Sequence, residues 1–205
     1  MADPIAAGGE LRLAFVTGTT PDRWARAWRQ RRPERLNLVP VSEEQQEVAV
    51  RRGDVDLALV RLRPDAAELP SPQDLHCVRL YDERQVVVAG RHHLVAAADT
   101  VTLHDLADEQ LVRPHASGWR PVAEQLDWPP MSEREAIETV AGGTGLVIVP
   151  MSVARLYRRK DVVHREVTDL PPATIALIWL RARDDDRTQA FVGVVKGRTA
   201  NTSRG

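Results

Sequence analysis

A short hydroxyl-rich loop, Thr17-Gly18-Thr19-Thr20, is the first part of the chain whose residue types suit ligand chemistry. It leads directly into an expected helix, and the exposed amides and positive dipole end of a helix N-terminus attract anions. The threonine hydroxyls add further hydrogen-bond donors. Simple capping of the helix by Thr20 is the alternative reading of the same residues.

Arg61 is the sharpest candidate for a contact with a charged ligand. It directly follows the apolar run Val55–Val60, and the carboxyl edge of a strand is where ligands approach an open α/β sheet. A guanidinium offers a planar fork that matches a carboxylate. The alternative is an ordinary exposed arginine at the end of a strand.

Ser42 stands at a similar junction, between an expected strand over 36–41 and a helix that begins at Ser42. With Gln45 three positions further on, it has the spacing of a capping box. Ser42 is therefore both an N-cap candidate and a ligand-donor candidate. If the sheet is parallel, both helix N-termini point toward one cleft.

The common catalytic patterns are missing from the sequence. His92-His93 are adjacent rather than four apart, and no Cys/His cluster has zinc spacing. Neither Gly-x-Ser-x-Gly nor a P-loop occurs. The glycine turn Gly142–Gly145 opens a strand, whereas a dinucleotide fingerprint follows one. We therefore expect no catalytic residue, no metal and no cofactor, and we assign Asp184–Asp186 to a solvated loop.

Strands and helices alternate in the segments that position these residues. Trp24 and Trp28 share one face of the first expected helix, which begins at Pro21 and stops at Pro33. An alternation of strand, helix, strand, helix and strand predicts an α/β fold with right-handed crossovers. The expected strands are 11–16, 36–41, 55–60, 77–80, 85–89, 146–149, 162–167 and 175–180, with later helices at 131–140, 152–159 and 187–195.

Composition narrows the class of protein. The 205 residues carry 28 Lys+Arg against 29 Asp+Glu, a near balance that argues against a whole-surface nucleic-acid binder. No apolar run approaches the roughly 20 residues that span a bilayer. The first ten residues lack the features of a secretory signal, and the single Cys77 fits a reducing compartment. We expect a cytoplasmic protein that does not insert into a membrane.

The segment Gly53–Leu59 (GDVDLAL) resembles an element of the effector-binding domain of LysR-type transcriptional regulators. That family carries Gly-x-hydrophobic-Asp-hydrophobic-small-hydrophobic after its second helix. His93 and Val95 depart from the family's His-Pro-Leu-Ala motif, where they replace the proline and the alanine. The segments that support the resemblance, in family order, are 11–20, Glu83–Val95 (ERQVVVAGRHHLV), Val101–Leu106 (VTLHDL) and Val140–Pro150 (VAGGTGLVIVP), so that it covers residues 11–195.

The resemblance implies the type 2 periplasmic-binding-protein fold, with two Rossmann-like α/β lobes joined by two crossover strands and a ligand between them. On this chain lobe I would comprise residues 1–84 plus 166–205, and lobe II residues 85–165. Residues 196–205 are expected to form a disordered tail.

The resemblance also implies site residues. Effectors of the family bind at the loop that holds Thr17, Thr19 and Thr20. Members that sense aromatic or dicarboxylic acids use an arginine at the position of Arg61.

In lobe II, His115, Ser117 and Trp119 lie on a loop that would close over the ligand. Gly143 and Thr144 would present backbone amides to the ligand. A plain surface histidine is the alternative interpretation of His115.

Only Met1–Glu10 precede the first expected strand, which leaves no room for the winged helix-turn-helix of a complete regulator. We therefore expect no direct DNA binding by this chain. It would be either a natural stand-alone sensor or a trimmed regulator. Its expected partners are a small-molecule effector, a second copy in a homodimer and a separately encoded DNA-binding protein.

The leading hypothesis is a non-catalytic sensor of an anionic metabolite that acts in transcriptional regulation. The ligand would favour a closed form and so change a surface that a partner recognises. The alternatives are an enzyme on the same scaffold, for which no poised acid, base or nucleophile is evident, and a transport-type solute-binding protein, against which the missing signal argues.

Overall fold

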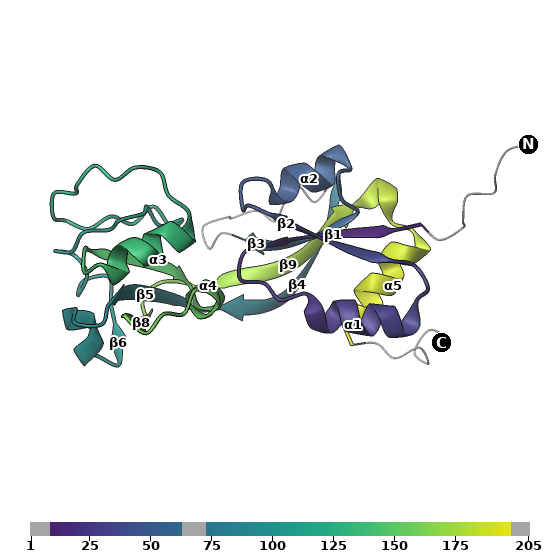
Figure 1. Ribbon diagram of the computed structural model, residues 1–205. Coiled ribbons are helices and arrows are strands. Elements are labelled where there is room, and N and C mark those ends of the chain that lie inside the picture. The colour runs from purple at the N-terminus through teal and green to yellow at the C-terminus, as the bar shows by residue number, and fades with distance from the viewer. Residues whose placement is uncertain (1–8, 63–72, 198–205) are drawn as a thin grey trace, which may run out of the picture. The chain divides into compact units, whose positions relative to one another are not determined.

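The computed structural model describes residues 9–62 and 73–197, and two strands, β4 (Leu75–Glu83) and β9 (Ala173–Leu180), run from one of its two units into the other. The first unit comprises residues 9–61, 73–80 and 175–197, and the second comprises residues 62 and 81–174 (Figure 1). The lobe boundaries expected at 84/85 and 165/166 stay a prediction. Most of the expected tail, from residue 198 on, lies outside the described residues.

The first unit is built on a five-stranded sheet in the order β2-β1-β3-β9-β4. β1 (Leu11–Val16) is parallel to both β2 (Leu36–Val41) and β3 (Leu57–Leu62). β1 and β2 have the bounds that the sequence predicts. The parallel pairing brings the carboxyl ends of these three strands to one edge of the sheet.

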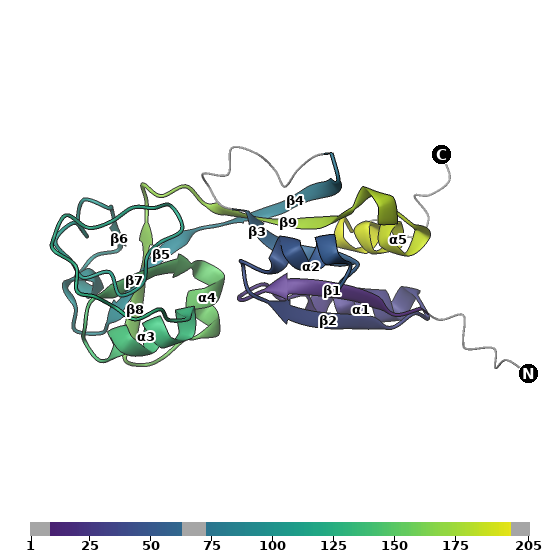
Figure 2. The same ribbon diagram turned by 90° about the horizontal axis from the view of Figure 1, so that it is seen from above.

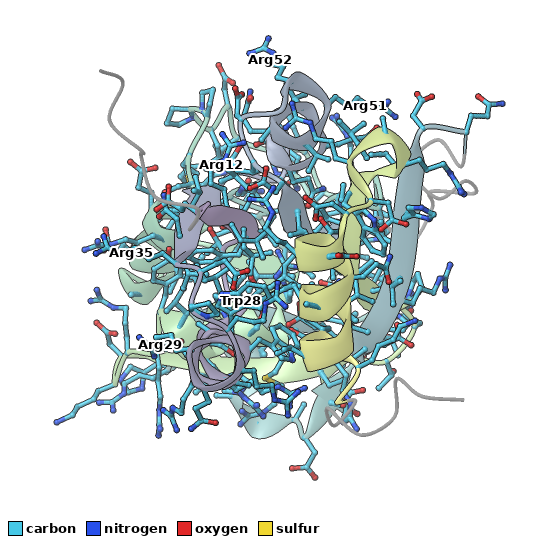
Figure 3. All side chains as sticks on the ribbon, turned by 90° about the vertical axis from the view of Figure 1, so that its right-hand side faces the viewer. Arg12, Trp28, Arg29, Arg35, Arg51 and Arg52 are labelled. Atoms are coloured by element: carbon cyan, nitrogen blue, oxygen red, sulfur yellow. The ribbon has the colours of Figure 1, made fainter. Side chains whose placement is uncertain are left out.

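Helices cover both faces of this sheet. α1 (Asp22–Arg31) and α5 (Asp186–Val195) lie on one face and α2 (Gln46–Arg52) on the other (Figure 1). The ring centroids of Trp28 and Phe191 are 5.7 Å apart and join α1 to α5. Figure 3 shows Trp28 directed into the unit, whereas Arg29 points outward. The aromatic face that the sequence predicts for α1 is thus the buried one.

Several expected boundaries in this unit are wrong. The second helix begins at Gln46 rather than Ser42, and the third strand is Leu57–Leu62 rather than Val55–Val60. The strands expected over 77–80 and 175–180 are the longer β4 and β9. A tertiary contact joins the observed helix start to the end of β3. The side chain of Gln46 accepts from the amide of Arg61 at 2.8 Å and donates to the carbonyl oxygen of Arg61 at 3.1 Å, which ties the start of the helix to the end of the strand.

The second unit holds a four-stranded sheet in the order β6-β8-β5-β7. β5 (Gln85–Gly90) is antiparallel to β7 (Leu146–Pro150) and β8 (Val162–Val167), while the short β6 (Thr100–Val101) is parallel to β8. A 3-10 turn, η1 (Leu94–Ala97), follows β5, and a second one, η2 (Arg181–Arg183), precedes α5 in the first unit. The sheet is therefore mixed.

Both faces of this sheet are apolar. Val86 and Val88 of β5 pack toward α3 (Glu133–Ala141) and α4 (Met151–Leu156), which cover one face (Figure 2). Val87 and Ala89 pack on the other face with loop residues such as Leu106. This division follows the alternation of side chains along a strand.

Of the helix ends predicted from local signals in this unit, one is confirmed and another is wrong. The capping box of Ser132 and Glu135 is present at the start of α3, as predicted. The helix expected over 152–159 is wrong in length, because α4 ends at Leu156 and the chain then turns toward β8. None of the helices within the described ranges is long and apolar enough to cross a membrane.

Candidate functional site

The three threonines of the loop after β1 differ in how far they are exposed to solvent. Thr19 is 5% exposed, and both its Oγ1 (2.7 Å) and its amide (3.1 Å) donate to the carbonyl oxygen of Val16. Thr17 is half-buried and Thr20 is exposed. Pro21 occupies the N-cap position of α1 without a side-chain hydrogen bond, so capping by Thr20 is wrong. Because the Thr19 hydroxyl is used within the loop, Thr17 and Thr20 supply the hydroxyls that remain for a ligand.

Arg61 lies within β3 and is 4% exposed, so the interpretation as an exposed strand-end arginine is wrong. Its Nη1 donates to Oε1 of Glu43, and its Nη2 donates to the carbonyl oxygen of Thr17 at 2.9 Å. Removal of a guanidinium from water is expensive unless anions or carbonyl oxygens accept its donors. The loops after β1 and β2 supply both kinds of acceptor to Arg61.

Ser42 lies at the same edge of the sheet, just after β2. Its side chain is exposed, and its carbonyl oxygen accepts from the amide of Gln45 at 3.1 Å. Residues 43–45 form a turn before α2, so the predicted capping box of Ser42 and Gln45 is wrong. Tertiary contacts of the next residue, Gln46, draw the helix start away from Ser42.

The parallel sheet thus gathers Thr17, Glu43 and Arg61 at one edge. Sequence reasoning missed Glu43 and Gln46. The sequence did contain a signal for Glu43, because this residue follows the second of three parallel strands within two positions. Ligands bind at the carboxyl ends of such strands, so Glu43 was a candidate for the same reason as Arg61. No local signal marks Gln46.

In the second unit, His115 and Ser117 form a tight turn. Nδ1 of His115 lies 2.8 Å from Oγ of Ser117, and this Oγ also accepts from the amide of Trp119 at 3.3 Å. The amide of Ser117 donates to the same His115 nitrogen at 3.3 Å. Because these bonds span only two residues and close a turn, they organise the loop.

The surroundings of His115 suppress its charge. The residue is 9% exposed, which contradicts the interpretation as a plain surface histidine. Burial, and secondarily the positive charge of Arg113, lowers the pKa of His115 to about 4. The imidazole is therefore neutral near pH 7 and can act as a hydrogen-bond donor or acceptor without bringing a positive charge.

Gly143 and Thr144 lie in the turn between α3 and β7. Gly143 lines a hollow of about 590 Å³ together with His93 and Glu109. Nε2 of His93 lies 3.2 Å from Oε2 of Glu109. Neither His115 nor Ser117 lines this hollow. This hollow therefore does not bring Gly143 together with His115 and Ser117.

Gln85, at the start of β5, is a further residue that sequence reasoning missed. It is 4% exposed, and its Oε1 has no hydrogen-bond partner among the residues that the structure describes. A buried acceptor without a partner is costly and unusual. Within the described ranges, no group of three or more His, Cys, Asp or Glu side chains is placed to hold a metal ion.

Three parallel strands of the first unit thus carry Arg61 and the threonine loop at their carboxyl edge. Two strands run from this unit into a second α/β unit. Open α/β sheets are a class of fold that binds ligands at this edge. Comparison with known proteins gives the family. Residues 6–200 match the LysR substrate binding domain family, and the chain belongs to it. The resemblance seen in the sequence is confirmed.

Individual relatives are distant. The HTH-type transcriptional regulator AlsR of Bacillus subtilis (strain 168) is 23% identical over 181 residues, which are 79% of this chain and 57% of AlsR. The chain thus spans little more than half the length of this relative.

Solved structures show the same fold. The effector binding domain of BenM with its effector benzoate matches with a TM-score of 0.72 at 20% identity, over 93% of this chain and 94% of that chain. The oxidized form of OxyR matches with a TM-score of 0.68 at 20% identity, over 93% and 96% of the two chains. The predicted type 2 periplasmic-binding-protein fold is therefore confirmed.

Proposed function

We propose that this chain is the sensing domain of a cytoplasmic transcriptional regulator and that its effector is a small carboxylate. Family membership and the similarity to AlsR support the regulatory role. The solved complex of a BenM effector domain with benzoate supports a carboxylate as the ligand class. Binding, rather than catalysis, is the proposed activity.

Arg61 carries the proposal. Its buried guanidinium already binds a carboxylate, that of Glu43, at the edge of the sheet that also holds the threonine loop. A guanidinium in such a position is a preformed anion receptor, because its donors are fixed and shielded from water. An incoming carboxylate would replace Glu43 or share the guanidinium with it.

The neighbouring polar groups would complete the receptor. Thr17 and Thr20 would donate hydroxyl hydrogens to the second carboxylate oxygen, and the exposed Ser42 would lie beside the bound ligand. Thr19 would act through the shape of the loop, because its hydroxyl is bound to Val16.

The second unit would contribute neutral groups. His115 and Ser117 would contact the apolar or polar body of the ligand, and the amides of Gly143 and Thr144 stay candidate donors. A neutral imidazole suits this role, because it adds a hydrogen bond without adding a second charge to the site.

Regulation would follow from ligand-dependent closure. A ligand that contacts both units binds the closed form more tightly and therefore increases its population. Closure would change a surface presented to a second copy of the chain and to the part of the regulator that binds DNA. Small-angle scattering should then show a smaller radius of gyration with bound ligand.

Calorimetric titration of the purified chain with benzoate, succinate and the uncharged analogue benzamide tests the ligand class. We expect at least one carboxylate to bind, and benzamide to bind at least about tenfold more weakly than benzoate if benzoate is a ligand, since hydrogen bonds to a charged group contribute about 1.5–3 kcal/mol. Equal affinity for benzoate and benzamide, or no heat with any carboxylate at millimolar concentration, would refute the proposal.

A further inference from the structure

A second hollow, of about 590 Å³, lies within the second unit beside α4 and β8. Its apolar lining includes Val88 of β5, Ala154 of α4 and Val162 of β8. These residues come from the sheet and from the helix that covers it, so the base of the hollow belongs to the ordered body of the unit. The volume is in the range of small-molecule sites.

Positive side chains line the rest of the hollow. Arg158, Arg159 and Lys160, between α4 and β8, line it, and so do His164 and Arg165 of β8. No carboxylate occurs among the described residues that line it. A concave surface with one sign of charge and low-dielectric walls concentrates ions of the opposite sign.

Only part of this charge is cancelled by neighbouring acids. Arg159 pairs with Asp161 at 2.7 Å, and the nearby Glu166 pairs with Arg84 at 2.7 Å. Arg158 and Lys160 are exposed and form no ion pair with a described residue. The pair of Arg159 and Asp161 is therefore neutral, and the other two cations stay available.

Arg165 is fixed without an acidic partner. Its Nη2 donates to the carbonyl oxygen of Ala96 at 2.7 Å and its Nη1 to that of His164 at 2.8 Å, while Nε donates to the carbonyl oxygen of Ala98. Carbonyl oxygens hold the guanidinium in place but leave its full positive charge. Because Arg165 is the cross-strand partner of Val87, its guanidinium lies on the opposite face of the sheet from Val88 and His164. It therefore raises the positive potential near the hollow without supplying donors inside it.

The pKa of His164 is also affected by the positive charges around the hollow. Partial burial lowers its pKa, and the charges of Arg165, Arg155 and Arg158 lower it further. Burial first, and then the surrounding cations, disfavour the charged form of this imidazole. An anion in the hollow would relieve this repulsion.

We propose that this hollow is a second binding site, specific for a small phosphate-bearing anion. Arg158 and Lys160 would bind the phosphate oxygens, and the apolar base would contact an organic substituent. Arginine and lysine are both common phosphate ligands. The site is separate from Arg61 and does not rest on the carboxylate proposal.

Calorimetric titration of the whole chain with inorganic pyrophosphate tests the site. The double variant Arg158→Ala/Lys160→Ala should bind pyrophosphate at least tenfold more weakly than the unaltered chain. The double variant Arg26→Ala/Arg29→Ala makes the same change in net charge on α1, in the first unit, and should change the affinity less than twofold. Equal losses in the two variants would show nonspecific attraction and overturn the proposal.

Further measurements locate the binding and define its chemistry. Pyrophosphate should shift the NMR signals of the His164 ring in the unaltered chain but not in Arg158→Ala/Lys160→Ala. Citrate should bind at least tenfold more weakly than pyrophosphate, whereas equal affinity would overturn the phosphate specificity. Absence of any heat at millimolar pyrophosphate, or an unmoved His164 signal, would overturn the site itself.

Discussion

Arg61 and Glu43 form an ion pair in which the arginine side chain is 4% exposed and the glutamate side chain 31% exposed. Glu43 lies in the turn between β2 and α2, and Arg61 lies in β3, 18 positions later in the chain. The pair is asymmetric: the guanidinium is enclosed, while water still reaches the carboxylate. Glu43 can therefore leave more readily than Arg61, and an exogenous carboxylate that takes its place inherits a preformed cationic partner.

Substitution Arg61→Ala should weaken the binding of a carboxylate ligand such as benzoate. The loss of hydrogen bonds to a charged group at a site that is largely shielded from water reduces the binding free energy by about 1–3 kcal/mol. This corresponds to an increase in Kd of roughly tenfold to a hundredfold. Calorimetry measures the change, and Arg61→Lys, which retains the charge but not the fork, should show an intermediate loss. Arg29→Ala, an exposed arginine on α1, is the control. An unchanged affinity in Arg61→Ala would remove this residue from the site.

Substitution Glu43→Gln should act in the opposite direction. A neutral amide competes less well for the guanidinium than a carboxylate does, so a carboxylate ligand should bind several-fold more tightly. Asp54→Asn removes the same charge from an exposed residue of the same unit and should have little effect. If Glu43→Gln weakens binding instead, Glu43 positions Arg61 for the ligand and does not compete with it.

The buried His115 should make the second unit less stable in mild acid. Its pKa is about 4 in the folded chain, below the value near 6.5 of an unfolded histidine, so the unfolded state binds more protons between these values. The contribution of His115 to stability is complete above about pH 6.5, decreases as the pH falls toward 4 and is constant below that, with a total loss of up to about 3 kcal/mol.

Urea unfolding at pH 7.0 and pH 4.5 measures this effect. In His115→Asn the fall in unfolding free energy between the two pH values should be smaller by roughly 2–3 kcal/mol than in the unaltered chain. The exposed His104 offers the matched substitution His104→Asn, which should leave the fall unchanged. Equal pH dependence in His115→Asn and the unaltered chain would contradict the neutral, buried state of His115.

Substitution Gly145→Ala should destabilise the second unit. Gly145 has φ +64°, and an added Cβ would lie 2.5 Å from the carbonyl oxygen of Gln110. Backbone strain and this clash together should cost about 2 kcal/mol or more in unfolding free energy. Gly193→Ala in α5 meets no heavy atom within 4 Å and should stabilise by about 0.5–1 kcal/mol. Similar unfolding midpoints for both variants would contradict the tight turn at Gly145.

Local sequence signals were sufficient for much of the fold. The apolar run of β1 and the alternating run of β2 predict their bounds, and Ser132 with Glu135 predicts the start of α3. These features depend on neighbours within four residues, through hydrogen bonds or side-chain periodicity. A pattern of residues can therefore indicate them without knowledge of the rest of the molecule.

The errors arise where distant residues meet. Gln46, the first residue of α2, binds the backbone of Arg61 near the end of β3 across 15 positions. The carboxylate of Glu43 likewise reaches Arg61 only because the parallel pairing aligns the strand ends. Spacing along the chain contains no signal for the Gln46 contact. For Glu43 it indicates only a place at the same edge of the sheet as Arg61, not the ion pair itself.

The amino-acid sequence by itself determined the family, the α/β class and the residues of the threonine loop and Arg61 as candidates, because these depend on ordered motifs and on local periodicity. Tertiary structure alone decided that Arg61 is buried with Glu43, that His115 is neutral in a tight turn and that the cations between α4 and β8 line one hollow. Burial and charge depend on which distant segments pack around a side chain, and packing is a property of the folded chain.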